Sequence, residues 1–268
     1  MSHYLKFTHL AAPQRRQRGI ALFVVLVIGM LSMLLALWAS RTSMFNELIV
    51  GNDADYQRAY EAAEALLVDA ELDIRGTRAD GLACTPDPSD ANICRGSAVG
   101  YAQIPLEATE VDPLLARLES EPTFCRNGLC AKRSGRQDFW NYTASTSPAP
   151  TDLQAGEVSL NAMEVAGVGA RYGQYTGAAL GASGTTPINP ILMDRSANDR
   201  GGWYWVEVLK YSDSQGSALM TSDDNSVTNL SLNLKPNVVY RITALAYGRR
   251  SNTVVVLQET FVRQIAKD

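Results

Sequence analysis

The longest uncharged stretch of the chain runs from Ile20 to Ser40 and reads IALFVVLVIGMLSMLLALWAS. At about 1.5 Å per residue, a helix of this length covers roughly 30 Å, the thickness of the bilayer hydrocarbon. Residues 1–19 contain basic side chains and no acidic ones, and Arg41 follows the stretch. This distribution predicts a membrane-spanning helix whose N-terminal side lies in the cytoplasm and whose continuation lies beyond the membrane.

A helical period continues after the apolar stretch. No proline occurs between Ile20 and Arg75, and Gly76 is a natural helix stop. Gly51 and Asn52 weaken the helix by roughly 1 kcal/mol or more. We therefore expect one helix of nearly 56 residues, with an amphipathic continuation over 41–76. Apolar residues recur there mostly every three or four positions, at Met44, Phe45, Leu48, Ile49, Tyr56, Ala59, Tyr60, Ala63, Leu66, Leu67 and Ala70.

The C-terminal third is rich in aromatic and β-branched residues, which favour strands. Three strands are predicted, over 203–211, 238–247 and 253–263. The last two are joined by GRRSN, with Gly248 and Asn252 as turn residues. The sequence thus predicts an α+β fold in which the long N-terminal helix packs against a C-terminal antiparallel sheet.

The middle of the chain, 77–202, has little periodicity. Asp112 and Pro113 predict a short helix, with Asp112 as the N-cap and Pro113 at the first helical position. That helix is expected to end by Pro122. The segments 143–151 and 177–190 have the composition of loops and are expected to be insertions on one globular domain spanning 77–268.

The four cysteines, Cys84, Cys94, Cys125 and Cys130, all follow the apolar stretch. An even number in an exported domain indicates disulfides, for which three connectivities are possible. We favour the local pairs Cys84–Cys94 and Cys125–Cys130, because turn-forming residues surround each pair. A zinc site is the alternative, but its ligand spacing would be irregular.

Other candidate chemistry is sparse. The acidic loop with Asp213, Asp223, Asp224 and Asn225 could bind calcium, but it lacks the spacing of an EF-hand, and a solvated loop is the simpler interpretation. No arrangement of residues indicates a catalytic nucleophile or a phosphate-binding loop. We therefore predict no enzymatic activity, no cofactor and no metal.

The N-terminal pattern RQRG followed by IALFVVLVIG resembles type IV pilins. That resemblance implies that a prepilin peptidase removes a leader, 1–19, by cutting after Gly19 and methylates the new N-terminus at Ile20. The other interpretations are an ordinary single-pass anchor and a secretory signal peptide. The signal peptide fits poorly, because the apolar run is long and the sequence WASRTSMF offers no clear cleavage site.

Cleavage would change both charge and chemistry. The net charge of the whole chain is −4, and loss of Lys6, Arg15, Arg16 and Arg18 would bring it near −8, since −4 − 4 = −8. This charge argues against nucleic acid as a partner. The two histidines, at positions 3 and 9, would be lost as well, which removes histidine-based catalysis and histidine metal sites.

Two further segments resemble PilX-type minor pilins, namely GNDADYQRAYEAAEALLVDAELDI after the apolar stretch and YRITALAYG with NTVVVLQ near the end. This resemblance implies a pilin-like structural protein that helps to initiate type IV pilus assembly. The implied partners are other minor pilins, the major pilin, the inner-membrane assembly platform and a large tip adhesin. The implied location is the inner membrane, with a periplasmic head, and then the pilus.

One position departs from common pilins, which carry a glutamate at the fifth residue after the cleavage site. Val24 occupies it here, and no acidic residue occurs between Ile20 and Ser40. PilX-like pilins and the tip pseudopilin of type II secretion commonly lack this glutamate, so its loss favours a position at the tip. Two alternatives stay open, a tip pseudopilin of type II secretion and a membrane-anchored periplasmic enzyme or receptor.

Overall fold

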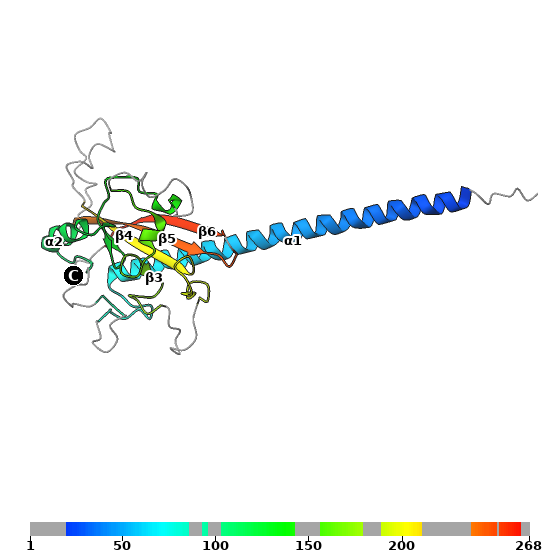
Figure 1. Ribbon diagram of the computed structural model, residues 1–268. Helices are drawn as coiled ribbons and strands as arrows, with labels where there is room; N and C mark the ends of the chain where they lie inside the picture. Colours follow the sequence, from blue (N-terminus) through cyan, green and yellow to red (C-terminus); the bar gives the residue numbers. More distant parts are fainter. Residues whose placement is uncertain are drawn as a thin grey trace, which may run out of the picture. The chain divides into compact units, whose positions relative to one another are not determined.

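The computed structural model describes residues 20–85, 93–95, 103–142, 156–178, 189–210, 237–250 and 252–263, and Figure 1 traces the chain. The chain divides into two compact units, Met1–Asn52 and Asp53–Asp268. Several predicted features lie outside the described residues, namely the leader through Gly19, the loop 143–151, residues 179–188 of the loop 177–190, and the acidic loop with Asp213, Asp223, Asp224 and Asn225.

Helix α1 spans Ile20–Arg75, so the predicted length of 56 residues is confirmed. It ends where the sequence predicts, because Gly76 adopts a left-handed backbone with φ of 68°. The N–H of Gly76 donates to the carbonyl of Asp73 at 3.0 Å, and that of Thr77 donates to the carbonyl of Leu72 at 3.0 Å. These two bonds form a Schellman motif that satisfies the last carbonyls of the helix.

Helix α2, Ala108–Glu119, begins earlier than the sequence suggested. The N-cap is Glu107 and not Asp112, and Pro113 lies inside the helix. A capping box explains the shift, because the side chains of Glu107 and Glu110 each accept a backbone N–H at the helix start. Stabilisation of the first turn thus outweighs the single intrahelical bond that the proline removes.

One mixed sheet carries six strands in the described part of the chain: β1 (Cys125–Arg126), β2 (Leu129–Cys130), β3 (Ala170–Arg171), β4 (Gly202–Lys210), β5 (Val238–Tyr247) and β6 (Val254–Phe261). The antiparallel pairing of β4, β5 and β6 confirms the predicted C-terminal sheet. The other edge of β4 is shared between β3, which is antiparallel to it, and β2, which is parallel to it. The short helices η1 (Phe139–Asn141) and α3 (Leu160–Met163) complete the described elements.

Two hydrophobic clusters cover opposite faces of the sheet. On one face, α1 contributes Ala59, Ala63 and Leu66, which pack in one cluster with Tyr204 and other residues of β4 and β5. In Figure 1 the end of α1 runs beside these strands. The second cluster contains Trp203 and Trp205 of β4, the Cys125–Cys130 pair and Phe139. Alternate residues of β4 therefore point into different clusters, as the period of a strand requires.

The helix packs on the sheet in a slightly different register from the one its apolar pattern suggested. Tyr56 and Tyr60, which were assigned to the apolar stripe, are 49% and 37% exposed. Asp55, one residue before Tyr56, is buried instead, and Ala59, which belongs to the predicted stripe, is buried as well. One residue corresponds to a rotation of about 100° around a helix, so the two tyrosines lie at the edge of the contact face.

Candidate functional site: an exposed apolar helix and a buried aspartate row

The first part of α1 presents apolar side chains on all its sides. Every residue from 20 to 50 is exposed in the isolated chain, including Ile20 at 70% and Val24 at 45%. The hydroxyl of Ser32 donates to the carbonyl of Ile28 at 2.8 Å, so it needs no outside partner. In the described part of the chain, α1 is the one helix long and apolar enough to cross a membrane. Such a surface requires lipid or other apolar helices around it.

A row of three buried aspartates marks the later part of α1. Asp55, Asp69 and Asp73 are 2%, 1% and 5% exposed. They fall on the same face as the buried Ala59, Leu66 and Ala70, at the three- and four-residue spacing of an amphipathic helix. Their burial was not predicted from the sequence, although acidic residues that interrupt an apolar stripe at this spacing are a signal that indicates it.

Of the three aspartates, Asp73 has the most extensive contacts. Arg95 donates from Nε to Oδ1 at 2.7 Å and from Nη2 to Oδ2 at 2.6 Å, which makes a bidentate pair. The hydroxyl of Tyr204 donates to Oδ2 at 2.9 Å. Arg95 also donates to the carbonyl of Asn127 at 2.9 Å and lies 4.0 Å from the ring centroid of Tyr175. Burial alone would lower the pKa of Arg95, but the Asp73 carboxylate raises it above its ordinary value.

Asp69 is buried beside a turn and has neutral partners. Its carboxylate accepts the backbone N–H of Gly173 at 2.6 Å and the hydroxyl of Thr176. Burial raises the pKa of Asp69 to about 7, and the nearby charge of Asp73 adds to this, although the two hydrogen bonds oppose it. The carboxyl of Asp69 therefore titrates near neutral pH. Asp73, one turn further along α1, is instead paired with Arg95.

Asp55 anchors the turn between β5 and β6. Its two carboxylate oxygens accept the backbone N–H groups of Arg249 and Arg250, each at 3.0 Å. Burial opposes ionisation, but these backbone bonds outweigh it and lower the pKa of Asp55. Gly248 leaves room for the carboxylate, because a Cβ there would collide with Oδ2 of Asp55. The turn also contains Asn252 with φ of 76°, in agreement with its predicted role as a turn residue.

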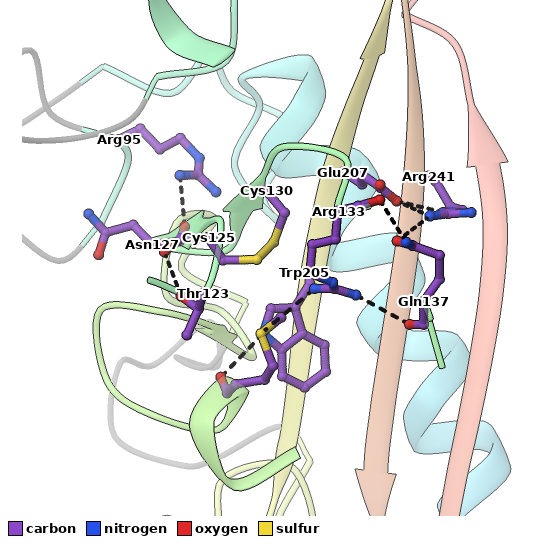
Figure 2. Close-up of a disulfide and its surroundings, with 11 residues drawn as sticks. Arg95, Thr123, Cys125, Asn127, Cys130, Arg133, Gln137, Trp205, Glu207 and Arg241 are labelled. Atoms are coloured by element: carbon purple, nitrogen blue, oxygen red, sulfur yellow. Dashed lines mark hydrogen bonds and ion pairs between the residues drawn. A yellow bond between two sulfur atoms is a disulfide. The ribbon is translucent and has the colours of Figure 1, made fainter. Parts of the chain in front are cut away.

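Two disulfides close short loops in the head. Cys84 bonds to Cys94 and Cys125 to Cys130, with Cα–Cα distances of 5.5 Å and 4.0 Å. This is the local connectivity favoured from the sequence. Cys125 and Cys130 are direct partners in the β1–β2 ladder, and Figure 2 shows their bond next to Trp205. Among the described residues, no group of three or more His, Cys, Asp or Glu side chains could hold a metal ion.

The three buried aspartates of α1 bind segments that are distant in sequence, namely Arg95, the backbone at Gly173 and the β5–β6 turn. Gly19 lies outside the described residues, Ile20 and Val24 lie in the first turns of α1, and Ser40 lies at the end of its uncharged stretch.

Comparison with protein families gives two matches. A family described as "Type IV pilus assembly protein PilX C-term" matches residues 126–263, and one described as "PilX N-terminal" matches residues 18–67. The first covers half of the chain and includes the described sheet apart from Cys125 at the start of β1. The second covers the apolar stretch of α1 and most of its amphipathic continuation. Comparisons with curated proteins and with solved structures find no match.

Proposed function

The chain belongs to the PilX family of type IV pilus assembly proteins, and we propose that it is a minor pilin that helps to initiate assembly from the pilus tip. In this role it is a structural subunit and not an enzyme. Its apolar helix anchors it in the inner membrane, with the head in the periplasm, and later packs among the helices of other subunits in the filament.

The observation that carries the proposal is the uniformly apolar first part of α1. No acidic residue occurs between Ile20 and Ser40, and Val24 stands where common pilins carry a glutamate. That glutamate is thought to pair with the N-terminal amine of a neighbouring subunit. Without such a neighbour it would be an unpaired charge among apolar helices, which costs several kcal/mol. A subunit at the tip has no neighbour above it, and Val24 avoids this cost.

The proposal includes processing and partners. A prepilin peptidase cuts after Gly19 and methylates the amine of Ile20. The partners are other minor pilins, the major pilin, the assembly platform of the inner membrane and a tip adhesin. The family matches favour the pilus over type II secretion, and they support a structural role over that of a periplasmic enzyme or receptor.

A genetic experiment tests the role in initiation. Deletion of the gene should reduce the number of pili per cell more than their length, because initiation is impaired and elongation is not. Loss of the retraction motor in the same strain should partly restore the number of pili, since rare filaments would then persist. A deletion strain with pili of normal number but reduced length would contradict a role in initiation.

A further inference from the structure

A small cavity lies against the face of the sheet that carries Trp203 and Trp205. Its walls include Arg133, Gln137, Trp205, Glu207, Arg241 and Thr243. Its volume is about 10 Å³. This is about the space that one water molecule needs. Figure 2 shows Arg133, Gln137, Glu207 and Arg241 grouped beside the Cys125–Cys130 disulfide.

Two charged side chains at this cavity each keep one polar atom without a hydrogen-bond partner among the residues that the structure describes. Arg133 and Glu207 are 6% and 9% exposed, and Nε of Arg133 and Oε1 of Glu207 are buried without a hydrogen bond to any described residue. The rest of each group is engaged. Arg133 donates from Nη2 to the carbonyl of Gln137 at 3.2 Å, and Oε2 of Glu207 accepts from Nε of Arg241 at 2.7 Å.

The two charges influence each other without direct contact. Burial lowers the pKa of Arg133, and the carboxylate of Glu207 opposes this effect while Arg241 adds to it. Within the described part of the chain, Arg133 forms no ion pair within 4.0 Å, whereas Glu207 pairs with Arg241. Both side chains line the same cavity, and there Arg133 has an N–H that needs an acceptor and Glu207 a carboxylate oxygen that needs a donor, counting partners among the described residues.

The chemistry of these two atoms selects the occupant. It must accept from Nε of Arg133 and donate to Oε1 of Glu207, and a water molecule does both. A chloride ion could accept the N–H of Arg133 but could not donate to Glu207, and the carboxylate would repel it. A cation would be repelled by the guanidinium of Arg133. We infer that this cavity binds a single water molecule that bridges Arg133 and Glu207. The bridge connects the chain that follows β2 to strand β4, independently of any role in the pilus.

The N–H of Arg133 provides a direct test in the full-length protein in detergent micelles, labelled with ¹⁵N-arginine. The Nε–H signal of Arg133, assigned by its loss in Arg133→Lys, should exchange slowly and show a cross-relaxation peak with a long-lived water. Arg136 is the matched control, since its side chain is 67% exposed and its Nε–H should exchange fast. A protected Arg133 signal without a water peak would overturn the inference.

Thermal unfolding supplies a second test. Arg133→Lys keeps the charge but removes the Nε–H donor, so it should lower Tm in the wild type and lower it less in a Glu207→Gln background. Replacing chloride with bromide or gluconate at constant ionic strength should leave Tm unchanged. Tm losses that add in the double variant would overturn the water bridge. A Tm that changes with the identity of the anion would also overturn it and would identify an anion site.

Discussion

Replacement of Asp73 by asparagine should strongly destabilise the head. The substitution preserves the size of the side chain and can still accept from Tyr204, but it leaves the guanidinium of Arg95 buried without its counter-ion. Arg95 is 7% exposed at its side chain and donates two hydrogen bonds to Asp73, at 2.7 and 2.6 Å. Removing one partner of a buried pair costs about 3–5 kcal/mol. This range agrees with two charge-assisted bonds of about 1.5–3 kcal/mol each.

The matched control is Glu71→Gln on the same helix. Glu71 pairs with Arg75 at 2.8 Å, but these side chains are 26% and 51% exposed. An exposed pair of this kind contributes about 0–1 kcal/mol. The assay is urea unfolding of the full-length protein in detergent micelles, followed by tryptophan fluorescence, since Trp203 and Trp205 are buried in the head.

The double variant Asp73→Asn with Arg95→Met refines this test. It removes both charges, so it should recover part of the stability that Asp73→Asn loses, because the uncompensated charge is gone. Equal effects of Asp73→Asn and Glu71→Gln would refute the reasoning. An additive double variant would show that the pair is not coupled.

Three further predictions concern other parts of the molecule. Burial raises the pKa of Asp69 to about 7, from about 3.9 in the unfolded chain, so the folded state binds this proton more tightly. The resulting stabilisation of the folded state is complete below the unfolded pKa. It is lost as pH rises through about 7. Wild type should thus lose stability relative to Asp69→Asn between pH 5 and pH 8, by at most about 1.4 kcal/mol per pH unit, and a pH-independent difference would contradict this. Peptide mapping under non-reducing conditions should find no free thiol among Cys84, Cys94, Cys125 and Cys130. Reduction should lower the free energy of unfolding by roughly 2–3 kcal/mol per disulfide. Four reduced cysteines with stoichiometric zinc would contradict the disulfides. Mass spectrometry of membrane-extracted protein should find an N-methylated terminus at Ile20, and an intact Met1 would exclude cleavage after Gly19.

Periodic elements could be predicted from the sequence, and contacts between distant segments could not. Helix α1 and strands β5 and β6 repeat their apolar residues locally over eight or more positions, so their patterns suffice. Three strands, β1, β2 and β3, have only two residues each. Of these, β2 and β3 form by pairing with β4, which is distant in sequence. No local pattern encodes such pairing.

The aspartate row illustrates the same limit. The sequence shows acidic residues on a helix, and a solvated helix is their simplest interpretation. Their burial depends on Arg95, Gly173 and the β5–β6 turn, the last of which lies 194 residues from Asp55. The early start of α2 was missed for a different reason, since a strong proline signal obscured the weaker capping box at Glu107.

The position of the protein in the filament is the central claim, and immunogold labelling of sheared pili tests it most directly. Antibodies against the globular head, residues 77–268, should label filament ends, with one or a few gold particles per pilus. Filaments from the deletion strain without the retraction motor provide the background. Gold spaced regularly along the shaft, at a density comparable to that of the major pilin, would contradict the account.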